Sequence, residues 1–111
     1  MNEATHLIVF CTCPSRDEAQ KLSRLLVKDG EAACVSLIPA IESVYRWKGN
    51  VETNDEFLLL IKTTAARYHA VERTIRQNHP YEVPEIIALP IVAGETHYLD
   101  WLSANCREME E

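Results

Sequence analysis

The sequence predicts an α+β protein with a ferredoxin-like β-α-β-β-α-β fold, a two-layer sandwich with an extended central hairpin and a C-terminal helix. Short apolar runs that are typical of buried strands alternate with segments whose apolar residues recur at helical spacing. A long strand pair occupies the middle of the chain. No repeat, linker or low-complexity segment interrupts the 111 residues, so we expect a single domain over 1–111.

The first strand and the first helix follow the N-terminus. The apolar run 7–11 predicts a buried strand, which Pro14 ends. Ser15 and Glu18 have the spacing of a capping box. Gly30 stands where a glycine C-cap is typical. Between these signals, the apolar residues recur at helical spacing: Ala19, Leu22, Leu25 and Leu26.

The central hairpin accounts for the second and third strands. Residues 32–38 predict a strand that Pro39 interrupts, as at a β-bulge. The hairpin continues over 41–61, with its turn predicted at Gly49-Asn50.

The length of this hairpin has a consequence for assembly. A strand of about twelve residues spans roughly 40 Å, whereas a globule of this size has a diameter of only ~34 Å. The hairpin is therefore predicted to project from the domain. Tyr45 and Trp47 lie on one of its faces, and such apolar surface and free strand edges favour association with further copies of the chain.

The remaining elements are shorter. Thr63 or Thr64 is predicted to cap a second helix, with an apolar stripe of Tyr68, Val71 and Ile75. This helix is expected to end near Asn78, because the residue before Pro80 avoids helical backbone angles.

The segment "EIIALPI" (85–91) predicts a short, buried fourth strand beside the first strand. Gly94 then opens a last helix, whose apolar residues are Tyr98, Leu99, Trp101 and Leu102.

Composition excludes several classes of function. The formal charge of −6 argues against nucleic acid or an anionic membrane as the main partner. No basic segment precedes the first apolar run and no run reaches membrane-spanning length, so we expect a cytoplasmic protein with reduced cysteines. No G-x-S-x-G, P-loop or H-E-x-x-H motif is present, and we expect a binding protein rather than an enzyme.

Five segments, in the same order and spacing, resemble the CutA divalent-cation tolerance family along nearly the whole chain. They are "FCTCPS" (10–15), "AACVSLIPAIESVYRWKG" (32–49), "EFLLLIKTT" (56–64), "HPYEVPEIIALPI" (79–91) and "YLDWL" (98–102). The resemblance implies a homotrimer of ferredoxin-like subunits whose hairpins complete sheets across the subunit boundaries. It also implies binding of copper, one ion per subunit, and of other divalent cations, with a role in metal tolerance.

The resemblance also suggests which residues hold the metal. The ligands proposed for the family correspond to Cys11 in the first strand and His79 before the "PY" pair. A neighbouring position, histidine in some members, is Asn78 here. An asparagine amide is a poor ligand for copper, so a lower affinity is expected. Ala40 stands where the family commonly has glycine after proline.

Each candidate ligand also has a structural interpretation. Cys11 can be a small buried apolar residue, although Cys13 shares its strand face and thiolates suit Cu(I) or zinc. His79 can act as a cation at a helix C-terminus. Glu82 and Glu85 can add a carboxylate ligand or remain solvated loop charges. Cys34 and Cys106 are expected to be packing residues.

A second function belongs to another class. A trimeric sensor could bind a small anionic ligand in clefts between subunits, through Arg46, Lys48 and Lys62 around the hairpin. Ligands that prefer the native state raise its stability. Thermal stability should therefore respond to copper under the first function and to anionic metabolites under the second.

Overall fold

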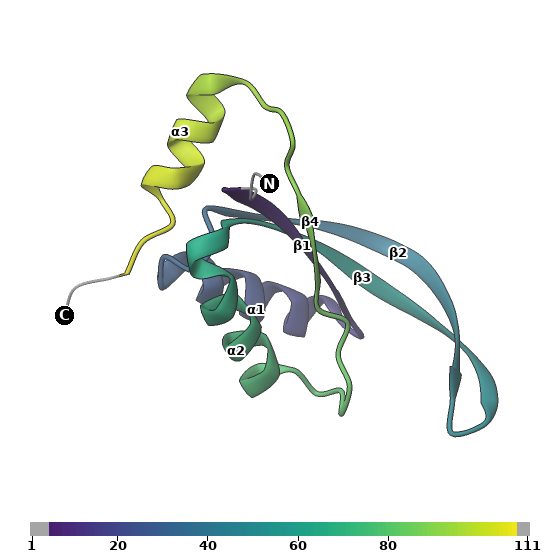
Figure 1. Ribbon diagram of the computed structural model, residues 1–111. Coiled ribbons are helices and arrows are strands. Elements are labelled where there is room, and N and C mark those ends of the chain that lie inside the picture. Colours follow the sequence, from purple (N-terminus) through teal and green to yellow (C-terminus); the bar gives the residue numbers. More distant parts are fainter. Residues whose placement is uncertain (1–4, 109–111) are drawn as a thin grey trace.

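A computed structural model describes residues 5–108 and has the predicted ferredoxin-like architecture (Figure 1). Four strands form an antiparallel sheet in the order β2-β3-β1-β4. Helices α1 and α2 cover one face of this sheet, and α3 lies at the end where β1 begins. The elements are β1 (His6–Cys13), α1 (Arg16–Lys28), β2 (Cys34–Trp47), β3 (Asn50–Thr64), the 3₁₀ turn η1 (Ala65–Arg67), α2 (Tyr68–Asn78), β4 (Ile87–Pro90) and α3 (Thr96–Ala104).

Helix α1 begins and ends as its sequence predicts. The Ser15 hydroxyl accepts a hydrogen bond from the Glu18 amide at 3.3 Å, which satisfies one of the free N–H groups of the first turn. Gly30 follows the helix with φ of 70°, a left-handed conformation that glycine adopts without strain. The buried side of α1 packs on the sheet through Ala19, Leu22 and Leu26.

Strand β1 is longer than predicted and ends at Cys13. It pairs with β3 and β4, so it is a central strand. Successive side chains of a strand alternate between faces. Val9, Cys11 and Cys13 accordingly point to the helix-covered face, where each is 0–1% exposed. This alternation brings both cysteines into the main core with Leu59 and Ile61.

The hairpin of β2 and β3 projects from the domain (Figure 1), as its length predicts. Its turn lies one residue earlier than expected: Lys48 and Gly49 form it, with φ of 50° and 84°, and Trp47 pairs with Asn50. Two residues with positive φ make a turn whose twist matches that of the flanking strands. The predicted Gly49-Asn50 turn is therefore wrong. Glycine occupies the second position of the turn in the structure, and the predicted pair would have placed it at the first.

The proline of β2 marks a bulge, also as predicted. The pairing with β3 shifts register between Ile38 and Ile41. Within this bulge Ala40 has φ of 60°, a left-handed conformation that costs residues with a Cβ roughly 1–2 kcal/mol.

Ala40→Gly is therefore expected to stabilise the protein by about 0.5–1 kcal/mol, the relief of left-handed strain less the greater backbone entropy that glycine loses on folding. Thermal or denaturant unfolding measures the change. Ala66→Gly is the matched control, because Ala66 lies in η1 outside the positive-φ positions and its replacement should destabilise. Equal destabilisation by both substitutions would contradict the strain at Ala40.

Three other expectations are corrected. Thr63 and Thr64 both belong to β3. Thr64 does stand at the N-cap position of η1, which leads into α2, but its side chain makes no capping hydrogen bond. The Thr63 hydroxyl instead donates to the Glu31 carbonyl at 2.6 Å. Helix α3 begins after Gly94, with the Glu95 carboxylate accepting from the Tyr98 amide at 2.9 Å.

The third correction concerns β4, which is shorter than 85–91 and exposed rather than buried. It does pair with β1, as predicted, with Phe10 opposite Ile87 and Ile8 opposite Leu89. It is an edge strand, so only one of its two sides has a neighbouring strand.

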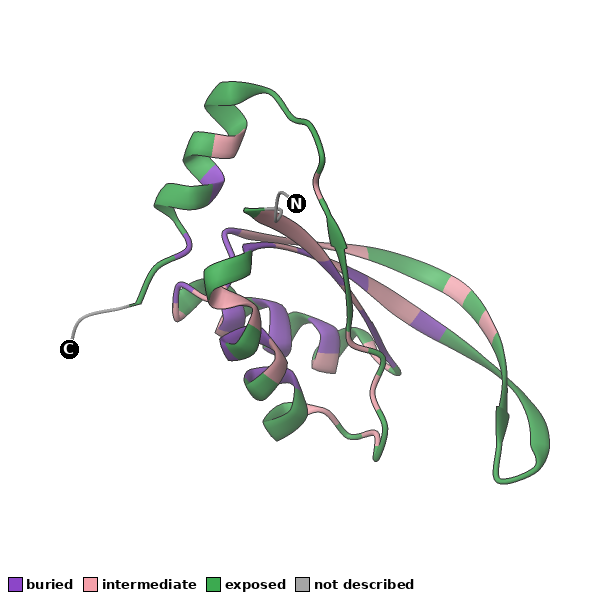
Figure 2. Cartoon of the chain, viewed as in Figure 1, coloured by how far each residue is buried: buried purple, intermediate pink, exposed green. Residues whose placement is uncertain are grey.

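The face of the sheet opposite α1 and α2 is apolar and uncovered. Strand alternation and register place seven large apolar residues there, all exposed or half-buried; we call this the helix-free face, and it comprises Ile8, Phe10, Ile38, Leu58, Leu60, Ile87 and Leu89. Figure 2 shows buried residues where α1 and α2 meet the sheet, and mostly exposed residues along β4, the projecting part of the hairpin and α3. Within residues 5–108, none of the helices has the length and apolar character needed to cross a bilayer.

Candidate metal centre

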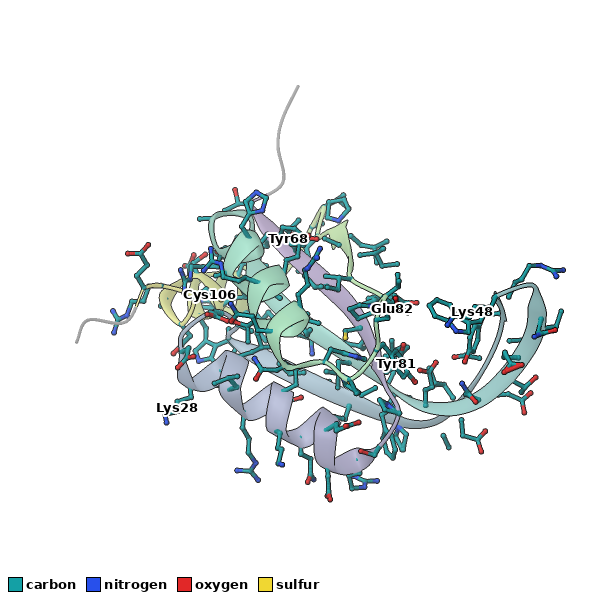
Figure 3. All side chains as sticks on the ribbon, turned by 90° about the horizontal axis from the view of Figure 1, so that it is seen from below. Lys28, Lys48, Tyr68, Tyr81, Glu82 and Cys106 are labelled. Carbon is teal, nitrogen blue, oxygen red and sulfur yellow. The ribbon has the colours of Figure 1, made fainter. Side chains whose placement is uncertain are left out.

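A cluster of three soft ligand groups lies where the end of β1 meets the end of α2. Cys11 and Cys13 come from β1, and His79 is the C-cap residue of α2. The backbone of His79 is extended, with φ of −93° and ψ of 138°, as a residue before proline prefers. In Figure 3 the labelled side chain of Tyr81, two residues on, lies in the same region, near the base of the hairpin.

The three groups are close enough to share one ion. The two thiol sulfurs and a ring nitrogen of His79 all lie within 4.8 Å of one another. Cys13 Sγ lies 3.8 Å from His79 Nε2. Cys11 and Cys13 are buried and His79 is half-buried. The predicted ligands Cys11 and His79 therefore come together within one chain.

Hydrogen bonds fix the orientation of the His79 ring. Nδ1 accepts from the Tyr81 amide at 3.1 Å. Nε2 lies 2.7 Å from the Thr12 carbonyl oxygen. An amide can only donate and a carbonyl can only accept, so the ring proton is on Nε2, which donates to Thr12. A metal ion bound at Nε2 has to replace this hydrogen bond.

The two thiols influence each other's acidity. The hydrogen bond between them raises the pKa of Cys11, and burial raises it further. The same hydrogen bond lowers the pKa of Cys13; burial opposes this, and the contact with His79 adds to it. The pair therefore loses its first proton at Cys13, below the usual range for a thiol. A thiolate is the form of cysteine that binds metals.

Opposing effects act on His79. Burial lowers the pKa of the ring, but the contacts with Cys13 and with the Thr12 carbonyl outweigh it and raise the pKa. The Tyr81 amide acts in the other direction, because a proton on Nδ1 would face another N–H group. Both ring nitrogens are thus already engaged, Nε2 with the Thr12 carbonyl and Nδ1 with the Tyr81 amide.

The two further candidate ligands lie outside the cluster. The Asn78 amide donates to the Thr74 carbonyl at 2.8 Å, within its own helix. Glu85 is exposed and is not one of the three grouped residues. Burial and the nearby Glu56 raise the pKa of Glu85. Neither side chain is positioned to complete the centre.

A buried carboxylate beside the centre was not predicted from the sequence. Glu56 is 5% exposed and accepts a hydrogen bond from the Tyr81 hydroxyl at 2.7 Å. Burial and this hydrogen bond raise the pKa of Tyr81. The contact ties the loop after His79 to β3. The sequence carries no local signal for it, because the two residues belong to distant segments.

The three basic residues of the alternative function do not converge within one chain. Lys48 belongs to the hairpin turn (Figure 3), and Arg46 lies just before it, where Arg46 Nη1 donates to the Gly49 carbonyl at 3.2 Å. Lys62 pairs with Cys34 at the opposite end of the strand pair. A site that used all three would need parts of several subunits.

Comparison with known proteins gives the family. A sequence profile described as "CutA1 divalent ion tolerance protein" matches residues 7–105. The chain belongs to the CutA1 family. It is 44% identical over 98 residues to the divalent-cation tolerance protein CutA of Thermus thermophilus, covering 88% of this chain and 95% of that protein. It is 43% identical over 101 residues to the chloroplastic CutA of Arabidopsis thaliana, covering 91% of this chain.

Solved structures agree with this assignment. The crystal structure of CutA1 from Oryza sativa matches with a TM-score of 0.91 and 40% sequence identity, covering 96% of this chain and 97% of that one. The recognition of the family from five sequence segments is thus confirmed. Some CutA relatives are longer: the chain spans 56% of the Arabidopsis protein.

Proposed function

We propose that this CutA1 family protein contributes to divalent-metal tolerance by binding copper, one ion per subunit, through Cys11 and His79. The observation that carries the proposal is that these two residues, far apart in the sequence, lie within 4.8 Å of one another at the edge of the core. Thiolate and imidazole are soft ligands that suit copper and zinc better than magnesium or calcium, which prefer oxygen. The relatives named as divalent-cation tolerance proteins support a role in metal handling.

Copper titration of the wild type beside Cys11→Ser tests this function. The wild type is expected to bind about one copper ion per chain, and Cys11→Ser should lower the affinity, because a serine hydroxyl is a much harder donor than a thiolate. Cys34→Ser is the matched control, since Cys34 lies in β2 and outside the cluster. Absence of copper binding by the wild type, or equal binding by all three proteins, would contradict the proposal.

We also propose that the protein is a homotrimer. The helix-free face leaves seven large apolar side chains without cover in the single chain, and the projecting hairpin presents free strand edges. Soluble proteins rarely leave such continuous apolar surface exposed. The number three comes from the family resemblance.

Two further parts of the proposal concern setting and mode of action. We place the protein in the cytoplasm, where its four cysteines, all free in the structure, would stay reduced. We propose that it acts by binding metal ions rather than by catalysis, with no nucleic acid or membrane as partner. The net charge of −6 supports the exclusion of polyanionic partners.

One observation supports the alternative of an anionic small ligand. Lys62 projects from the helix-free face, where its ammonium group donates to Ser36 Oγ at 2.7 Å and approaches Cys34 Sγ at 3.8 Å. In the part of the chain that the structure describes, it has no carboxylate partner. Thermal unfolding separates the two functions: copper should raise the unfolding temperature under the first, and anionic metabolites under the second.

A further inference from the structure

We infer that Cys13 is a ligand of this centre, and that the centre is a three-coordinate site of two thiolates and one imidazole that takes Cu(I). The inference rests on the proposed function, because it concerns the same cluster. It adds a ligand that neither the family resemblance nor the paired candidates Cys11 and His79 include. It also specifies the oxidation state of the ion.

The position of Cys13 suits a metal ligand. Of the two sulfurs, Cys13 Sγ is the one in direct contact with His79, at 3.8 Å from Nε2. Metal–sulfur and metal–nitrogen bonds of about 2.3 and 2.0 Å place their two donors about 3.7 Å apart when the angle between them is near 120°. The observed separation of 3.8 Å is therefore close to the spacing of two donors in a trigonal site.

Cys11 lies on the same face of the same strand as Cys13. Its sulfur completes the group within 4.8 Å, and its other contact is a distant one, to the Thr12 carbonyl at 3.8 Å. Removing Cys13 would leave the centre with one sulfur and one nitrogen. Two protein ligands hold an ion less firmly than three, and Cys13 needs no rearrangement to act as the third.

The surroundings of the cluster bear on which ion it holds. Among residues 5–108, no fourth histidine, cysteine, aspartate or glutamate belongs to the group. Asn78 is bonded to its own helix, and the Glu56 carboxylate is held by Tyr81. Structural zinc sites are almost always four-coordinate, and both thiols are shut away from water, at 0% and 1% exposure. A buried set of three soft donors therefore favours Cu(I) over zinc.

Binding of Cu(I) also has a defined effect on His79. When Nε2 binds the ion it can no longer donate to the Thr12 carbonyl, and the proton of the neutral ring is then on Nδ1. A metal-bound histidine normally donates its other ring N–H to an acceptor, but here Nδ1 faces the Tyr81 amide, which is a donor. The contact between Nδ1 and Tyr81 must therefore open in the loaded protein.

X-ray absorption of the Cu(I)-loaded protein, prepared without oxygen, counts the sulfur ligands directly. The wild type is expected to show two sulfurs and one nitrogen at the copper, and Cys13→Ser should show one sulfur. Competition with a chromophoric Cu(I) chelator should show at least a tenfold loss of affinity in Cys13→Ser. Cys106→Ser is the matched control, because Cys106 is buried but belongs to the separate core cluster of α3, and it should change neither measurement.

The outcomes separate this inference from the proposed function. Wild-type protein that binds neither Cu(I) nor Cu(II) would overturn both, and binding of Cu(II) alone would overturn only the inference. A single sulfur in the wild-type spectrum, or unchanged affinity in Cys13→Ser together with a loss in Cys11→Ser, would overturn the role of Cys13 and leave the proposed function standing. The wild-type sulfur count decides the matter even if Cys13→Ser fails to fold.

Discussion

Leu60→Glu is expected to abolish the proposed trimer. Leu60 lies in the middle of the helix-free face, opposite Phe10 of β1 and Ser36 of β2. If this face is covered by other subunits, the new carboxylate is buried without a partner, at a cost of several kcal/mol. Sedimentation at micromolar concentration should show the wild type near three times 12.7 kDa and the variant without that species.

The control adds the same charge at a place that assembly should not cover. Gln20 lies exposed on α1, on the layer opposite the helix-free face, so Gln20→Glu should sediment like the wild type. Trp47→Glu, on the projecting hairpin, should impair assembly as Leu60→Glu does. A wild type that is a folded monomer at micromolar concentration would refute the trimer. A trimer that persists in Leu60→Glu would show that another surface is used.

His79→Ala is expected to weaken copper binding by more than about 100-fold while the proposed trimer persists. Loss of an outer partner of a metal ligand typically costs about 10–100-fold in affinity, and His79 is a proposed direct ligand. The same substitution also removes the hydrogen bonds to Thr12 and Tyr81, so unfolding measurements should accompany the chelator competition.

His69→Ala provides the matched control for this loss. His69 lies exposed on α2, outside the cluster, and its replacement should leave copper affinity unchanged. If His79→Ala also retained the wild-type affinity, the ring would serve to fix the loop between α2 and β4. Its interpretation as a structural residue at the end of the helix would then be correct.

Much of the candidate site could be anticipated from the sequence because its signals are local. The C-x-C spacing puts both sulfurs on one face of a strand through alternation alone. The proline after His79 predicts an extended backbone at the end of a helix. Which of the two cysteines contacts the His79 ring could not be predicted, because this depends on how α2 packs on β1.

The errors in the fold have a similar origin. Gly49-Asn50 and Lys48-Gly49 differ by one residue, and only the pairing of Trp47 with Asn50 decides between them. Threonine is a common helix cap, but the hydroxyl of Thr63 donates to the carbonyl of Glu31, in the loop between α1 and β2. Strand β4 has the apolar sequence of a buried strand, yet it lies at the edge of the sheet.

The sequence by itself determined the order of the elements, the cap of α1, the projecting hairpin and the family. These depend on interactions between residues a few positions apart, or on the length of a segment. The tertiary structure decided that Cys13 contacts His79 and that the Tyr81 amide donates to His79 Nδ1. It also decided that Glu56 is buried and bonded to Tyr81, in the loop after α2. Such contacts join segments whose approach depends on the packing of the whole core, and no local propensity encodes them.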